Sequence, residues 1–329
     1  MATGIVPGPY VLNLIDSSIL NISSELRKIA LIIILTRAGL GLDITGLKKI
    51  GRPAILMCFL PASFELLGII LIAPKALGMS VLEAAIMGAV LAAVSPAVVV
   101  PRMVKLMDNG YGTAKGIPQL ILAGASVDDV YVIVLFSTFT GMMQGKGASV
   151  INFVNIPVSI ILGMGIGILA GYLLAMYFEK IHIRDTVKVL LILSISFILV
   201  ATEDMLNTPI KFSALIAIMF VGATVNINYL GNMGIKALIV IFGALIFRMA
   251  GVFVCLIKTE LNKKERLFTM MAYTPKATVQ AAIVGIPLAL NFACGETVLT
   301  IAVLAIVITA PLGAFAMDLS YKKLLRRNE

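Results

Sequence analysis

The run from Ile117 to Met143 contains only two charged residues, and these are the adjacent carboxylates Asp128 and Asp129 near its middle. The run is long enough to cross a bilayer, because a spanning helix needs about 20 largely apolar residues. A charged side chain at the bilayer centre costs about 2.5–3.5 kcal/mol on the insertion scale. Two neighbouring carboxylates are therefore difficult to explain as packing groups. They predict a cation or proton site inside the membrane.

The composition agrees with a membrane protein. Hydrophobic residues make up 60% of the chain and charged residues 13%, whereas soluble domains average about 45–50% apolar and about 25% charged residues. The net charge of +9 arises largely from lysines and arginines in short loops between apolar runs, which is the positive-inside pattern of membrane topology. It therefore does not indicate a nucleic-acid partner. The sequence contains no phosphate-binding loop, dinucleotide fingerprint or nucleophile elbow, so we expect neither an enzyme nor a bound cofactor.

Ten segments are long and apolar enough to be predicted as spanning helices. They cover residues 27–42, 53–73, 81–105, 117–143, 151–178, 187–203, 211–228, 235–257, 266–290 and 296–319. Residues 1–26 contain no span and are predicted to lie at the membrane interface. Residues 27–329 are predicted to form a single integral membrane domain. The expected protein is all-α and multi-pass, and it resides in the cell membrane.

Two of these helices are interrupted in the same way. One contains Ser95-Pro96 followed by Pro101, and the other contains Thr274-Pro275 followed by Lys276. Proline removes a backbone donor and clashes with the preceding helical turn. In lipid, such a break persists only where protein or a water-filled cavity surrounds it. Paired broken helices predict an inverted-repeat transporter with its site at the midplane, although prolines that merely kink helices are the alternative.

Three more ionisable residues lie at similar depth, namely Glu65, Arg248 and Lys276. With the two aspartates they make three carboxylates and two cations, which leaves one negative charge in excess. One proton or one sodium ion would balance it, as a site where the two compete requires. The alternative is that the carboxylates only neutralise the cations and hold the helices together.

The two breaks also offer oxygen ligands. Ser95, Thr278 and Gln280 supply neutral oxygens close to them, and hard cations such as sodium prefer oxygen. Carboxylate, hydroxyl and freed carbonyl oxygens could together form a cation cage. The ammonium of Lys276 is placed to offset the partial negative charge at the carbonyl end of a broken helix.

Four motifs carry a resemblance to a known family. They are Ser95-Pro-Ala-Val-Val-Val-Pro101, Ala125-Ser-Val-Asp-Asp129, Phe247-Arg248 and Thr274-Pro-Lys-Ala-Thr-Val-Gln-Ala-Ala282. In this order they resemble the monovalent cation:proton antiporters, and in particular the sodium/proton branch with a double aspartate and a Pro-Lys-Ala-Thr-Val-Gln broken helix. The resemblance covers nearly the whole chain.

The resemblance implies a core of crossing broken helices, residues 53–143 and 235–319, that moves against a scaffold of residues 27–42 and 151–228. It implies that Asp129 binds the transported sodium or lithium ion, with Asp128 beside it and paired with Arg248. Glu65 resembles the partner of that arginine, and Lys276 resembles the residue beside the crossing. Members of the family usually form homodimers.

The predicted topology conflicts with this resemblance. Alternation through ten spans places the basic loop after residue 257 and the basic C-terminal tail outside, against the positive-inside rule. An inverted repeat also needs an odd offset between spans 53–73 and 235–257, whereas the count gives six. The segment 211–228 either spans or is re-entrant, and the chain resembles a family member shortened at its N-terminus and around residue 219. The alternatives to sodium/proton exchange are a potassium/proton antiporter and a remnant that does not transport.

Overall fold

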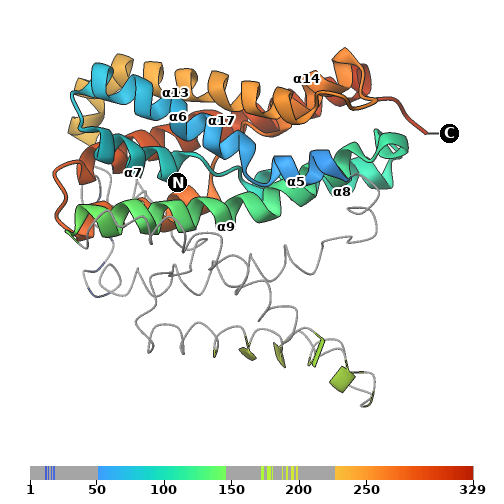
Figure 1. Ribbon diagram of the computed structural model, residues 1–329, viewed down its shortest axis with the longest axis horizontal. Coiled ribbons are helices and arrows are strands. Elements are labelled where there is room, and N and C mark those ends of the chain that lie inside the picture. The colour runs from blue at the N-terminus through green and yellow to red at the C-terminus, as the bar shows by residue number, and fades with distance from the viewer. Residues whose placement is uncertain are drawn as a thin grey trace.

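The computed structural model describes residues 51–145 and 227–328, together with isolated positions between 12 and 18 and between 172 and 198. The first stretch contains α5 (Arg52–Met57), α6 (Leu60–Leu77), α7 (Val81–Leu91), α8 (Pro96–Asp108), the short 3-10 helix η1 (Thr113–Lys115) and α9 (Ile117–Met143). The second contains α13 (Ile227–Cys255), α14 (Lys263–Ala272), α15 (Thr278–Ile283), α16 (Ile286–Ala289) and α17 (Gly295–Leu324). In these stretches the structure consists of helices joined by turns and loops, with one isolated antiparallel bridge between Tyr111 and Arg327 (Figure 1). The predicted all-α architecture is confirmed.

Five helical segments of the described residues are long and apolar enough to span a membrane. They are Arg52–Leu77, Val81–Asp108, Ile117–Met143, Gly234–Cys255 and Gly295–Leu324. These match the predicted spans 53–73, 81–105, 117–143, 235–257 and 296–319. The predicted span 266–290 falls on α14, α15 and α16. The predicted spans 27–42, 151–178, 187–203 and most of 211–228 lie outside the two described stretches.

Two boundaries differ from the prediction. Helix α13 begins at Ile227, inside the segment predicted as the separate span 211–228. The first described span is interrupted after Met57, so that α5 and α6 follow one another with a short turn between them. Pro61 lies in the first turn of α6, where its missing N–H leaves no helical hydrogen bond unmade.

Both broken helices begin with the same local signal. Ser80 caps α7 by accepting a hydrogen bond from the Glu83 N–H, and the Glu83 carboxylate accepts one from the Ser80 N–H. Asn262 and Glu265 make the equivalent reciprocal bonds at the start of α14. Each arrangement satisfies two backbone donors that a helix N-terminus leaves free. The same capping motif therefore determines where each of the two helices begins.

Helices α6 and α13 pack closely in opposite directions. A Cβ added at Gly68 would lie 2.6 Å from the Phe247 ring, and one added at Gly251 would lie 2.9 Å from the Pro61 Cα. Early residues of α6 thus face late residues of α13, and glycine is required at both contacts because a larger side chain would overlap its neighbour.

Helix α9 runs in the same direction as α6. The Ser63 hydroxyl lies 2.8 Å from the Tyr131 hydroxyl, while Gly124 lies against Met57. The unit from α6 to α9 and the unit from α13 to α17 consequently run in opposite directions, as Figure 1 shows. The predicted inverted repeat is confirmed.

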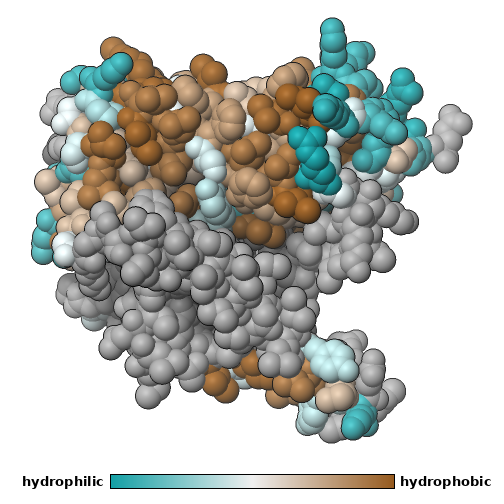
Figure 2. All heavy atoms as spheres, in the orientation of Figure 1, coloured by the Kyte–Doolittle hydropathy of each residue, from teal (hydrophilic) through white to brown (hydrophobic). Residues whose placement is uncertain are grey.

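Charged loops from both units meet at one end of the bundle, which we call the basic end. It comprises the loop 109–116, the loop 256–262, the C-terminal residues 325–328 and the neighbouring turns of α8, α14 and α17, which carry Arg102, Glu265 and Asp318. Lys115 Nζ lies 2.8 Å from the Glu265 carboxylate and donates to the Glu260 carbonyl. Arg327 bridges to Tyr111. Figure 2 shows hydrophilic side chains gathered at this end beside a largely apolar surface.

The prediction that the loop after residue 257 and the C-terminal tail lie opposite the loop 109–116 is therefore wrong. Helix α9 ends at the end of the bundle where α13 begins, and α13 runs back to the basic end. The basic loops then share one side, as the positive-inside rule requires.

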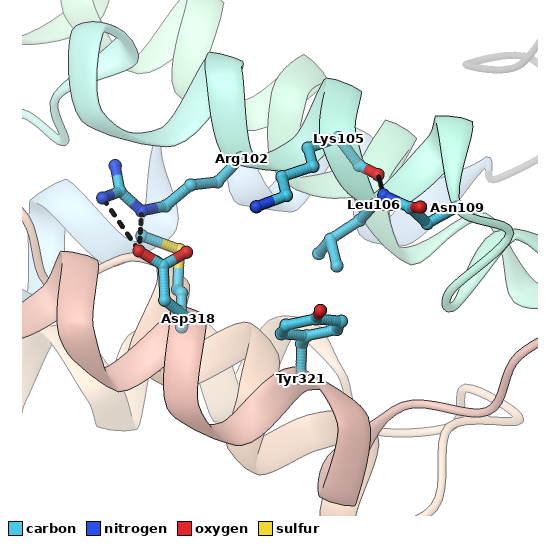
Figure 3. Close-up of a pocket in the computed structure, with 7 residues that line it drawn as sticks. Arg102, Lys105, Leu106, Asn109, Asp318 and Tyr321 are labelled. Carbon is cyan, nitrogen blue, oxygen red and sulfur yellow. Dashed lines mark hydrogen bonds and ion pairs between the residues drawn. The ribbon is translucent and has the colours of Figure 1, made fainter.

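A small pocket at the basic end lies between α8 and α17 (Figure 3). Its volume is about 10 Å³, which is room for about one water molecule. Arg102 crosses it to pair with Asp318 at 3.1 Å. The pocket is too small to bind a larger ligand, so the candidate site lies elsewhere.

Candidate functional site

The two helix breaks touch each other at the centre of the bundle. Helix α7 ends at Leu91 and α8 begins at Pro96, while α14 ends at Ala272 and α15 begins at Thr278. The Ser95 N–H donates to the Pro275 carbonyl at 2.8 Å. This bond joins the non-helical segment of one repeat to that of the other, which is the predicted crossing.

The carbonyl end of α7 is covered by side chains from the second repeat. The Leu91 carbonyl accepts from Lys276 Nζ at 2.5 Å, and the Ala92 carbonyl accepts from Arg248. Gln280 Nε2 donates to the Ala93 carbonyl at 2.5 Å. These donors offset the partial negative charge at the end of a broken helix. The carbonyls at the end of α7 are thus not free, as the predicted cation cage required, but accept hydrogen bonds from protein donors.

The second break is held by a different set of groups. Arg248 Nε donates to the Tyr273 carbonyl at 2.6 Å, and the guanidinium lies over the Tyr273 ring at 5.5 Å. The Lys276 N–H donates to the Thr309 hydroxyl at 3.1 Å. Gly313 packs against the Pro275 ring, so closely that a Cβ there would require displacement. Helix α17 thereby fixes the backbone that carries Lys276.

Tyr273 and Thr309 are positioning residues that the sequence analysis missed. Both are buried, and each acts on the site through a backbone group. A threonine or tyrosine in an apolar run gives no signal of its own, because such residues are also common in ordinary helix packing. Only the position of Tyr273 directly before the Thr274-Pro275 motif pointed toward the site.

Four of the five predicted ionisable residues form one buried network. Arg248 lies 2.8 Å from the Glu65 carboxylate and 2.8 Å from the Asp128 carboxylate. Lys276 Nζ lies 2.5 Å from the other oxygen of Glu65. Asp128 also accepts from the Val94 N–H at 2.9 Å, which ties α9 to the first break. Each charge is completely or almost completely withdrawn from solvent, so each depends on its partners for stability.

Asp129 lies beside this network and differs from the other four. Its side chain is 1% exposed, and its Oδ1 has no hydrogen-bond partner among the described residues. No ion pair joins it to a cation within residues 51–145 and 227–328. A buried carboxylate without a partner is costly. The excess negative charge of the site therefore belongs to Asp129.

Other buried oxygens near the crossing are also without hydrogen-bond partners in the described part of the chain. They are Ser95 Oγ, Asp128 Oδ1, Thr278 Oγ1 and Gln280 Oε1. Pro96 and Pro275 flank these groups at the two breaks. Oxygen acceptors of this kind suit a hard cation. The described residues hold no cluster of three or more histidine, cysteine, aspartate or glutamate side chains that would indicate a resident metal centre.

A family model described as sodium/hydrogen exchanger, transmembrane, matches residues 1–235. The chain belongs to this family. Sodium/hydrogen exchanger 9B2 of Homo sapiens is 33% identical over 353 residues, which cover 93% of this chain and 65% of that protein. Sodium/hydrogen exchanger 9B1 of Macaca fascicularis is 31% identical over 353 residues, covering 93% and 68%. This chain therefore spans slightly less than two thirds of the length of exchanger 9B2.

A solved structure supports the fold. The sodium proton antiporter MjNhaP1 from Methanocaldococcus jannaschii matches with a TM-score of 0.80 and 20% identity, over 98% of this chain and 91% of that one. The antiporter fold with crossing broken helices is thereby confirmed. Membership of the family and the five apolar spans establish a multi-pass integral membrane protein.

Proposed function

We propose that this chain exchanges sodium or lithium ions for protons across the membrane at Asp129. The observation that carries the proposal is the contrast within one buried group of charges. Glu65, Asp128, Arg248 and Lys276 balance one another through direct ion pairs, and Asp129 is left with the uncompensated charge. A proton or a monovalent cation restores neutrality, and each excludes the other.

The surrounding groups have distinct proposed roles. Asp128, held by Arg248 and the Val94 N–H, contributes its free oxygen beside Asp129. Ser95, Thr278 and Gln280 supply neutral oxygens to the dehydrated ion. Glu65 and Lys276 keep the charges around Arg248 and the α7 carbonyls in balance. The backbone carbonyls of residues 91–93 already accept hydrogen bonds from Arg248, Lys276 and Gln280, so we assign the ion ligands to the side-chain oxygens.

We propose alternating access as the transport step, with residues 53–143 and 235–319 moving as a core. The predicted scaffold segments 27–42 and 151–228 lie largely outside the described residues. Asp129 is neutralised when it carries a proton and also when it carries a cation. In both states the site would therefore move between the two sides of the membrane with no net charge at Asp129. A homodimer, as the family resemblance implies, completes the proposal and is testable by the molar mass of the purified protein.

The test is collapse of an imposed pH gradient in proteoliposomes on addition of sodium, lithium or potassium. Wild-type protein should collapse the gradient with sodium or lithium. Asp129→Asn should behave as protein-free vesicles, because an amide cannot exchange a proton for a cation. Asp108→Asn, which removes an exposed carboxylate at the end of α8, is the matched control and should transport normally.

Three outcomes would overturn the proposal. Transport by Asp129→Asn would remove that residue from its role. Absence of transport by inserted wild-type protein would support a non-transporting remnant, and a response to potassium alone would indicate potassium/proton exchange.

A further inference from the structure

An apolar groove opens between α13, α14 and α17, away from the buried charges. Its volume is about 300 Å³. Phe242 and Ile246 of α13 form one wall, and Leu312 and Ala316 of α17 form another. This is many times the volume that one water molecule needs, so the groove has room for a narrow hydrocarbon chain.

The inner wall of the groove is the backbone break that carries Lys276. Thr274, Thr309 and Gly313 line it. Thr309 accepts from the Lys276 N–H, and Gly313 packs on Pro275. Whatever occupies the groove consequently lies against the groups that hold the second break in place.

The mouth of the groove faces the hydrocarbon of the membrane. Ile246 is 68% exposed and Leu312 is 56% exposed, and both lie in spanning helices. Exposed apolar side chains on a spanning helix contact lipid chains, because no water is present at that depth. The surroundings of the groove therefore supply hydrocarbon and exclude a polar solute.

Two lysines lie on the helix faces that extend from the groove to the basic end. On α14, Met271, Leu267 and Lys264 share one helical face, and on α17 Ala316, Leu319 and Lys323 do so, because residues three and four apart lie on the same face. Each lysine is seven residues from the groove, which is about 10 Å along a helix.

The two lysines lie at the same end because the loop 109–116 contacts both Glu265 and Arg327. Both are exposed, and neither has an ion-pair partner among the described residues. Anionic headgroups bind basic groups in this position at the membrane surface.

We propose that the groove binds one acyl chain of an anionic phospholipid, whose phosphate lies between Lys264 and Lys323. The acyl chain passes along Leu267 and Leu319 into the groove and ends against Thr274 and Thr309. In this position it supports the break that carries Lys276 from the lipid side. A bound lipid thus stabilises the core without touching the ion site.

The first test compares thermal unfolding of the purified full chain in detergent with added phosphatidylglycerol or phosphatidylcholine. Phosphatidylglycerol should raise the Tm more than phosphatidylcholine does. The double substitution Lys264→Gln/Lys323→Gln should remove this difference. Lys263→Gln/Lys322→Gln removes the same charge from neighbouring positions on other helical faces and should retain it. An equal loss in both double variants would overturn the proposal, since it would show general attraction of basic loops for anionic lipid.

The second test concerns the acyl chain of the lipid. Ala316→Phe fills the groove and should abolish lipid retention in native mass spectrometry, while Ile235→Phe, on an exposed part of α13 outside the groove, should leave it intact. Soluble glycerol phosphate should not shift the Tm, because it lacks the chain. Stabilisation by glycerol phosphate equal to that by phosphatidylglycerol, or retention of lipid by Ala316→Phe, would overturn the proposal. Neither measurement depends on transport, so failure of the proposed exchange activity would be seen separately.

Discussion

The crossing of the broken helices and the basic end both contain ion pairs between the two repeats, but the pairs differ in kind. At the crossing, Arg248 bonds Glu65, Asp128 and two backbone carbonyls, and it is fully buried. At the basic end, Arg102 pairs with Asp318 while their side chains are 28% and 49% exposed. Removing a buried partner leaves an uncompensated charge in a region of low dielectric constant, whereas water replaces a lost partner at the surface.

This difference indicates which contacts hold the two repeats together most strongly. The crossing depends on a few shared partners, so that a change in one residue disturbs several others. At the basic end the contacts are largely separate from one another, and each contributes little alone. We therefore expect substitutions to fall in a steep order from the crossing outward.

Arg248→Ala should have the largest effect on stability. It leaves Asp128 without its cation and Glu65 with Lys276 alone, and it frees the carbonyls of Ala92 and Tyr273. Loss of one partner from a buried pair costs about 3–5 kcal/mol, which should lower the Tm strongly in detergent or yield little folded protein.

Arg102→Ala is the control for Arg248→Ala, since it removes the same side chain from an exposed pair. Arg248→Lys should fall between the two, because an ammonium keeps the charge but cannot reach every acceptor of a guanidinium. A normal Tm for Arg248→Ala would contradict the assigned network.

The two neighbouring aspartates should respond in opposite directions when each is replaced by asparagine. Asp128→Asn loses its ionic bond to Arg248 and should cost about 1–2 kcal/mol, the difference between charged and neutral hydrogen bonds. Asp129→Asn removes an unpaired buried charge and should leave the Tm unchanged or raise it. Parallel melting curves of the two variants measure this directly. A larger loss for Asp129→Asn would show that Asp129 has a partner that stabilises its charge.

The sequence indicated which buried charges lie together but not the relative direction of the helices, and the reasons are physical. A charged residue within an apolar run is costly unless it is paired, so Glu65, Asp128, Arg248 and Lys276 were expected to pair with one another. The structure brings them together. The donor from Lys276 to the end of α7 was predicted, but the donor from Gln280 was not, because Gln280 was interpreted as an oxygen ligand of a cation. Its amide nitrogen instead reaches Ala93, and which end of an amide faces a ligand depends on packing in three dimensions.

The direction of α13 relative to α9 could not be obtained from hydropathy. The predicted span 211–228 overlaps α13, which begins at Ile227. Composition measures how apolar a segment is and not where a helix starts. The direction of α13 became clear only from its close contacts with α6 at Gly68 and Gly251.

Lys115→Gln should have an intermediate effect on stability, because only one partner of its ion pair, Glu265, is buried. The side chain of Lys115 is 30% exposed and that of Glu265 is 3% exposed. Glu265 keeps its bond from the Asn262 N–H in the capping box, so the expected loss is about 1 kcal/mol. Lys258→Gln, an exposed lysine in the adjacent loop, is the matched control. A loss comparable with that of Arg248→Ala would show that the basic end is as interdependent as the crossing.

Arg102→Gln should have the smallest effect and should be distinguished by its response to salt. Exposed pairs contribute about 0–1 kcal/mol, and ions screen such charges within roughly 10 Å at 0.1 M salt. The small difference in Tm between wild type and Arg102→Gln should therefore vanish as the salt concentration rises. The difference between wild type and Arg248→Lys should persist, because salt does not reach the crossing. If both differences vanished together, the crossing would be accessible to solvent, and the contrast between the two regions would be one of residue type and not of burial.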